Sequence, residues 1–130
     1  MASNPPRPTD AELEILSVLW ETGPCTVREV FEVLLKRRTA QYSTVLKFLQ
    51  IMAEKGLVRR DESQRAHVYE AARPREWTQQ QLLGDLLERA FAGSAKALVM
   101  GALSARKTNR KELAEIEALL KRYRKEKDAQ

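Results

Sequence analysis

Apolar residues recur every three or four positions in three consecutive segments of the first half of the chain. These segments span residues 9–20, 26–38 and 41–56. The spacing predicts three amphipathic helices, each with one buried face. Thr9 with Glu12, and Thr26 with Glu29, place a hydroxyl and a carboxylate three residues apart, so the first two helices should begin with capping boxes. Gly56 should end the third helix, because glycine readily adopts the left-handed conformation that follows a helix.

The pattern then changes from a helical period to short strands. Residues 57–60 and 65–69 predict two strands, and the polar residues 61–64 between them predict a hairpin turn. Three helices followed by a basic two-stranded hairpin are typical of a winged helix-turn-helix, which we expect over residues 9–72. The preceding residues 1–8 contain three prolines in four positions. Proline opposes a helix, so this segment should form a flexible extended arm.

Three further helices are predicted over residues 73–130. Pro74 can open the first, the second covers residues 94–104, and Asn109 with Glu112 predicts a cap on the third. Short helices in so small a region bury little surface alone, so we expect their apolar faces to meet a second copy of the chain. The residues expected at this dimer contact are Leu83, Leu86, Leu87, Phe91, Leu98, Leu113, Ile116, Leu120 and Tyr123. The alternative is an intramolecular three-helix cap on the winged domain.

The predicted fold class is therefore mainly α. A winged helix-turn-helix of three helices and a two-stranded β-hairpin wing is followed by a C-terminal three-helix dimerisation region.

The start of the third segment carries the most informative side chains. Four hydrogen-bonding residues and a lysine one turn later have little use on a helix that only packs. A helix whose N-terminal end enters a DNA major groove needs such groups. Ser43 and Thr44 have an alternative role as helix caps, and Tyr42 has one in packing. With the start of the second helix and the wing included, the candidate DNA-binding residues are Thr26, Gln41, Tyr42, Ser43, Thr44, Lys47, Arg60, Arg65 and His67.

These candidates differ in the contact that each residue type favours. Thr26 is first a helix cap, but the amides at a helix N-terminus also bind phosphate. Lys47 favours a phosphate contact over base reading. Neighbouring strand residues point to opposite faces, so Arg59 and Arg60 cannot both face DNA. His67 is the only histidine, and no Cys, Asp or Glu set with ligand spacing accompanies it, so a structural or phosphate-contacting role is favoured over a metal site.

The formal charge of +5 suits a polyanionic partner, but the distribution of charge is more informative. Residues 1–72 carry ten Lys and Arg against ten Asp and Glu, whereas residues 73–130 carry thirteen against eight. Within the first part, four acids lie on or beside the first helix, and residues 26–70 hold nine bases against six acids. We therefore expect a dipolar winged domain whose positive side contains the second helix, the third helix and the wing.

Other classes of protein find little support in this sequence. It has no glycine-rich phosphate loop, no His-Glu-x-x-His motif and no Ser-His-Asp set, so we expect no enzyme, no catalytic residue, no cofactor and no metal. No apolar stretch approaches the roughly 18–20 residues of a membrane span. Cys25 is the single cysteine, which fits a reduced cytoplasm and excludes an internal disulfide. A redox-responsive regulator and a winged-helix module that binds protein remain alternatives.

Five stretches, in order and at matching spacing, resemble the penicillinase repressor family of bacterial transcription regulators. They are residues 9–20, 26–30, 42–45, 54–58 and 65–69. The resemblance implies a cytoplasmic homodimeric repressor that binds a palindromic DNA operator through its third helix. It also implies that the wing lies on flanking phosphates and that the C-terminal helices form the dimer.

The resemblance further implies a route of induction. Members of the family are commonly derepressed when a membrane-bound sensor protease pathway leads to cleavage of an Asn-Phe bond in the C-terminal helices. The matching stretch here runs through Met100, Gly101 and Ala102, so glycine and alanine replace both residues of that pair. These three positions are the candidate cleavage region, and regulation by a ligand or a redox signal without cleavage is the alternative.

Overall fold

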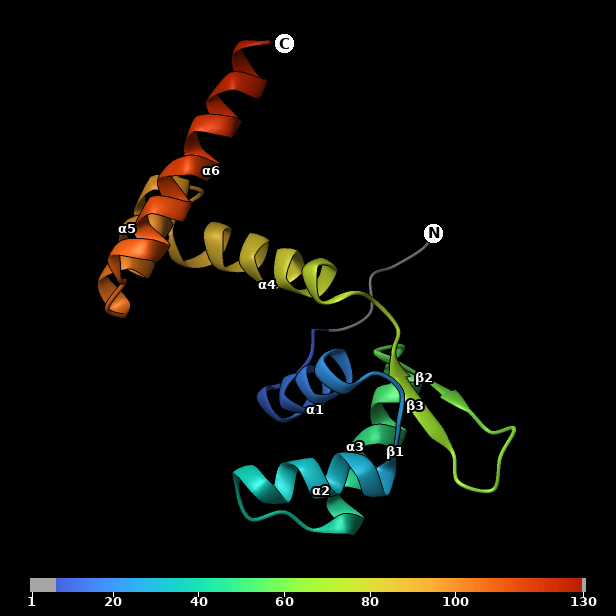
Figure 1. Ribbon diagram of the computed structural model, residues 1–130. Coiled ribbons are helices and arrows are strands. Elements are labelled where there is room, and N and C mark those ends of the chain that lie inside the picture. Colours follow the sequence, from blue (N-terminus) through green and yellow to red (C-terminus); the bar gives the residue numbers. More distant parts are fainter. Residues whose placement is uncertain (1–6, 130) are drawn as a thin grey trace. The chain divides into compact units, whose positions relative to one another are not determined.

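The computed structural model describes residues 7–129 and is mainly helical (Figure 1). Its elements, in chain order, are α1 Asp10–Thr22, β1 Cys25–Thr26, α2 Val27–Arg37, α3 Tyr42–Lys55, β2 Val58–Asp61, β3 Val68–Ala71, α4 Arg75–Ala90, α5 Ala95–Ala105 and α6 Arg110–Asp128. The first three helices and the small sheet form the winged helix-turn-helix that the sequence predicts. Most of the predicted arm, residues 1–6, lies outside the described residues.

The helix starts follow the predicted capping residues. In α1 the Thr9 hydroxyl accepts a hydrogen bond from the Glu12 N–H at 3.2 Å, while the Glu12 carboxylate accepts one from the Thr9 N–H at 2.9 Å. Thr26 and Glu29 make the same pair of bonds at the start of α2. The third helix ends at Gly56, whose φ of 81° lies in the left-handed region that glycine adopts without steric penalty. Local bonds therefore fix where these helices begin and end.

One apolar core holds the three helices and the sheet together. Its members are Ile15, Leu16, Val18, Leu19, Cys25, Val27, Val30, Leu34, Val45, Leu49, Met52, Leu57, Val58 and Tyr69. Burial of an aliphatic or aromatic side chain contributes about 1.5–3 kcal/mol relative to an exposed one, so this core dominates the stability of the winged unit. Because Val45, Leu49 and Met52 face inward from α3, the opposite face of that helix is left to solvent.

The sheet has three antiparallel strands in the order β1-β3-β2, which is one strand more than predicted. β1 comprises only two residues, and so short a strand leaves no alternating pattern in the sequence. The predicted second wing strand at residues 65–69 is wrong in its bounds, because β3 begins at Val68. The pairing of Asp61 with Val68 is the last in this ladder. Beyond it, the Asp61 carboxylate accepts a hydrogen bond from the Ser63 N–H at 2.9 Å, which turns the chain away from the strand.

A buried ion pair joins the beginning of α1 to the end of α3. The Glu12 side chain is 2 % exposed, and its two carboxylate oxygens accept hydrogen bonds from the Lys55 ammonium at 3.0 and 2.9 Å. Burial alone would raise the pKa of Glu12, but the Thr9 N–H and the Lys55 ammonium together lower it below its ordinary value of 4.5. The carboxylate is therefore charged at neutral pH, where it both caps α1 and holds the last turn of α3.

The first turns of α4 pack with the winged unit. Trp20 of α1 donates its indole N–H to the Arg73 carbonyl at 3.0 Å, and the Arg75 guanidinium lies 5.7 Å from the centroid of the Trp20 ring. One compact unit of the chain runs to Leu83, and a second begins at Gly84. The division between the units therefore falls inside α4.

The C-terminal helices leave most of their apolar side chains exposed. Neither α5 nor α6 contains a buried residue, and the buried residue of α4 is Thr78. The large apolar side chains of α4 to α6 that are at least 38 % exposed are Leu83, Leu86, Val99, Met100, Leu113, Leu119, Leu120 and Tyr123. One internal contact lies at Gly101, where an added Cβ would be 3.5 Å from the Phe91 ring. Within residues 84–129, a single chain therefore builds no buried core.

Candidate nucleic-acid interface

The first turn of α3 presents its polar side chains to solvent. Gln41, Tyr42, Ser43, Thr44 and Lys47 are all exposed. The N-cap of the helix is Gln41, whose side chain makes no capping bond, so the alternative role of Ser43 and Thr44 as helix caps is wrong. Among the residues that the structure describes, no hydrogen bond engages either hydroxyl. Both groups are therefore available to a ligand.

All but one of the candidate residues line one of two hollows. The first, of about 480 Å³, lies between α2, α3 and the wing, and brings together positions far apart in the sequence. The candidates in its lining are Thr26, Tyr42, Arg60, Arg65 and His67. The residues that line the second, along α3, are Ser43, Thr44, Lys47, Phe48 and Ile51. Gln41 lines neither of these hollows.

Arg28 is a functional candidate that sequence reasoning missed. It lies in the first turn of α2, lines the first hollow, and places its guanidinium 5.3 Å from the centroid of the Tyr42 ring. Phe31 meets the same ring edge-on, with the centroids 5.7 Å apart. Tyr42 therefore packs against α2 as well as facing the hollow. The sequence does show an arginine two residues after the predicted cap Thr26, which could have suggested a phosphate contact at the start of this helix. Its contact with Tyr42 on another helix, however, is a matter of tertiary structure.

Ion pairs neutralise some of the positive charge expected along the second helix. Acids of α1 pair with the basic end of α2, Glu21 with Arg37 at 3.0 Å and Glu14 with Arg38 at 2.7 Å. The cations that line the two hollows and have no carboxylate partner within residues 7–129 are Arg28, Lys47 and Arg65. The unpaired positive charge at these hollows therefore lies beside α3 and the wing.

The two neighbouring arginines of β2 line different hollows, as the geometry of a strand predicts. Arg60 lines the first hollow, where hydrogen bonding to Tyr69 and the charge of Glu62 raise its pKa. Arg59 lines a separate hollow and forms an ion pair with Glu70 at 3.3 Å. Arg60 is therefore the arginine of this pair that shares a space with the other candidates.

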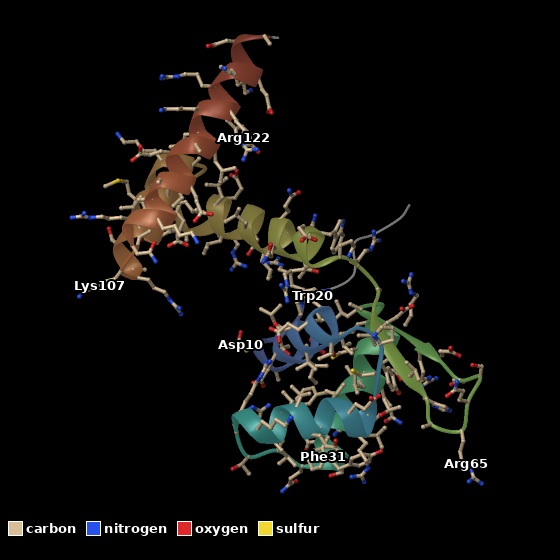
Figure 2. All side chains as sticks on the ribbon, in the orientation of Figure 1. Asp10, Trp20, Phe31, Arg65, Lys107 and Arg122 are labelled. Carbon is tan, nitrogen blue, oxygen red and sulfur yellow. The ribbon has the colours of Figure 1, made fainter. Side chains whose placement is uncertain are left out.

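The loop between β2 and β3 extends the first hollow outward. Arg65 and His67 lie in this loop and are exposed. Figure 2 shows Arg65 at the outer end of the loop, with its side chain directed away from the strands. A cation on a projecting loop can reach an anionic group that the body of the domain does not touch.

The described residues offer little for other kinds of chemistry. No three His, Cys, Asp or Glu side chains in that part of the chain gather where they could hold a metal ion. No helix drawn from residues 7–129 is long and apolar enough to cross a membrane. Cys25 is buried, with its sulfur 3.1 Å from the Thr22 hydroxyl. A thiol buried in the core is a poor target for an oxidant.

A winged helix-turn-helix with an exposed polar face on its third helix and unpaired cations beside it has the architecture of a DNA-binding transcription regulator. Comparison with known families narrows this class. The family model for the penicillinase repressor matches residues 8–122. The chain therefore belongs to the penicillinase repressor family, whose members are transcriptional repressors and not enzymes.

Individual relatives agree with this assignment. The transcriptional regulator BlaI of Mycobacterium tuberculosis is 38 % identical over 93 residues, which cover 70 % of this chain and 67 % of that protein. The corresponding protein of a second strain of the organism gives the same values. The solution structure of the DNA-binding domain of the repressor BlaI is 27 % identical, with a TM-score of 0.50 over 57 % of this chain and 90 % of that one. This match supports the winged-helix fold of the N-terminal unit.

Proposed function

We propose that the protein is a homodimeric, sequence-specific repressor that binds a palindromic DNA operator. The observation that carries the proposal is the exposed polar face of α3 beside a hollow lined by arginines, in a chain of a repressor family. In this proposal α3 enters the major groove, and the wing loop lies along flanking phosphates. A bound dimer represses transcription because it covers promoter DNA and excludes RNA polymerase.

The proposed contacts divide into base edges and phosphates. The residues assigned to base edges, in and before the first turn of α3, are Gln41, Ser43 and Thr44. The residues assigned to phosphates are Thr26, Arg28, Tyr42, Lys47, Arg60, Arg65 and His67. Thr26 acts through the backbone amides at the start of α2, since the N-terminus of a helix attracts anions. Arg28, Arg65 and Lys47, which have no carboxylate partner within residues 7–129, supply the unpaired charge that positions the protein without reading the sequence.

The exposed apolar side chains of the C-terminal helices support the homodimer. Leu113, Leu120 and Tyr123 of α6 are 38 %, 62 % and 66 % exposed, and they follow a heptad-like spacing that suits the pairing of helices. Their spacing puts these side chains on one side of α6, and a second copy of the chain would remove their apolar surface from water. A two-fold dimer then offers two α3 helices to two half-sites that are separated by whole turns of DNA.

Induction by proteolysis is proposed for the middle of α5. Met100, Gly101 and Ala102 lie within this helix, and Met100 is 59 % exposed. Cleavage requires local unwinding of the helix, which Gly101 makes easier by about 1 kcal/mol relative to alanine. The corresponding partner is a membrane-bound sensor protease pathway, with the repressor itself in the cytoplasm.

A selection from random duplex DNA tests the proposed function. The purified protein is mixed with a pool of duplexes, the bound sequences are recovered and read, and the mass of the complex is measured by analytical ultracentrifugation. We expect an inverted repeat that binds two protein chains. Recovery of no preferred sequence would favour a winged-helix module that binds protein. A single chain on an asymmetric site would refute the symmetric dimer.

A further inference from the structure

Gln50 lies in the middle of the exposed face of α3, three residues after Lys47 and seven after Ser43. At 3.6 residues per turn these three positions share one side of the helix, opposite its buried face. A rise of about 1.5 Å per residue puts Gln50 about 10 Å beyond Ser43, which is about three base-pair steps of 3.4 Å. One face of α3 can therefore address several successive base pairs, well beyond its first turn.

The Gln50 side chain lies beside the wing. It lines the first hollow with Arg65 and His67, and a neighbouring hollow with Glu54 and Arg60. The side chain is exposed, and within residues 7–129 no hydrogen bond engages its amide. An amide has both a donor and an acceptor, so when it is unbonded and flanked by arginines it suits the recognition of a base more than the support of the fold.

The neighbours of Gln50 on this face offer less base-reading chemistry. Leu46, one turn earlier, has no polar side-chain atom. Glu54, one turn later, carries a negative charge that a phosphate repels, so the DNA-facing surface of α3 should end near this residue. Lys47 is a flexible cation, which suits a phosphate better than the edge of a base. Gln50 is therefore the side chain beyond the first turn that is best suited to discriminate between bases.

We propose that Gln50 is a specificity-determining residue that recognises an adenine in the major groove of the operator. Its amide nitrogen donates to adenine N7 and its amide oxygen accepts from the adenine N6 amino group, a bidentate pair that no other base offers. The inference rests on the proposed function, because it requires α3 in a major groove. Beyond that function, it specifies which base, adenine, the operator should carry at one position of each half-site.

The test replaces Gln50 and determines which base each variant prefers in the half-site. Sites are selected from the same duplex pool by the wild type, Gln50→Ala and Gln50→Arg. We expect the wild type to prefer adenine at one position of each half-site, and Gln50→Ala to lose that preference alone. Gln50→Arg should change the preference to guanine, whose O6 and N7 accept the two donors of arginine. Gln79→Ala and Gln79→Arg, at an exposed glutamine of α4, are matched controls and should leave the preference unchanged.

A single-atom change in the DNA tests the contact itself. Replacement of the selected adenine by 7-deazaadenine removes the N7 acceptor but keeps the base pair. We expect the wild type to bind the changed site about 5- to 10-fold more weakly, and Gln50→Ala to bind both sites equally. The expected loss lies at the lower end of the roughly 5- to 150-fold range for a full bidentate contact, because one of the two hydrogen bonds remains.

Two outcomes would overturn the inference while the proposed function stands. In the first, the wild type selects a defined site and Gln50→Ala selects the same site with the same preferences. In the second, 7-deazaadenine weakens both proteins equally. If the wild type selects no site, the proposed function fails and the inference fails with it.

Discussion

The removal of the Arg65 side chain should reduce the salt dependence of DNA binding by a calculable amount. In each chain three cations at the hollows lack a carboxylate partner within the described residues, namely Arg28, Lys47 and Arg65. A dimer would then neutralise about six phosphates, and at about −0.9 per phosphate the slope of log affinity against log salt is about −5.4. Arg65→Ala removes two of these contacts, so its slope should be about −3.6. Over a fourfold rise in salt, the wild type should lose about 2,000-fold in affinity and the variant about 150-fold.

Fluorescence anisotropy on one labelled duplex, titrated at four or more salt concentrations, measures these slopes. Arg59→Ala is the matched control, because Arg59 lies on the same wing but lines a separate hollow and pairs with Glu70. We expect the slope of the control to equal that of the wild type. Equal flattening of the slope by Arg59→Ala and Arg65→Ala would refute this prediction, because charge alone and not its place in the hollow would then govern binding.

Two further predictions concern the dimer and the core. Leu120 is 62 % exposed, and covering it in a dimer should contribute about 1–2 kcal/mol per chain, so Leu120→Ala should weaken dimerisation by about 30- to 1,000-fold in sedimentation equilibrium. Leu35→Ala, at a leucine that is 46 % exposed on α2, should leave dimerisation unchanged, and an equal effect would exclude the proposed contact. The pKa of Glu12 is lowered in the folded protein, so its contribution to stability should be fully present above about pH 4.5. That contribution should be lost as the pH falls through the pKa of Glu12 in the folded protein. Glu12→Gln should destabilise the protein by about 1–3 kcal/mol in urea unfolding near neutral pH, because Lys55 loses its charged partner. The difference in stability between the variant and the wild type should shrink in acid. A difference that does not depend on pH would count against the ion pair.

The features that the sequence predicted are those that local interactions determine. The capping boxes of Thr9 with Glu12 and Thr26 with Glu29 join residues only three positions apart, so their residue types suffice to locate them. The inward face of α3 follows in the same way from helical periodicity. The exposed first turn could be predicted with it, because polar residues at the other positions of a half-buried helix must face away from the core.

The features that the sequence did not predict depend on residues distant in the chain. The start of β3 is set by its pairing with β2, in which Arg60 lies opposite Tyr69, and by the turn at Asp61 that closes the ladder. The stacking of Arg28 on Tyr42 joins two helices, and periodicity within either helix does not reveal it. The role proposed for Gln50 likewise depends on its place beside the wing, which is a matter of tertiary structure.

The proposed architecture allows DNA to be released without any change in the reading residues. A single winged unit has three unpaired cations at its hollows, so its salt slope should be about −2.7, which is half that of the dimer. Linking two binding modules commonly raises affinity by 10²–10⁴, and the same factor is lost when the link is broken. Cleavage in α5, or any ligand that separates the C-terminal helices, would therefore derepress while Ser43, Thr44 and Gln50 stay in place. Leu120→Ala, studied below its dimer dissociation constant, should accordingly bind DNA with the halved slope, whereas an intramolecular cap would keep the slope of the wild type.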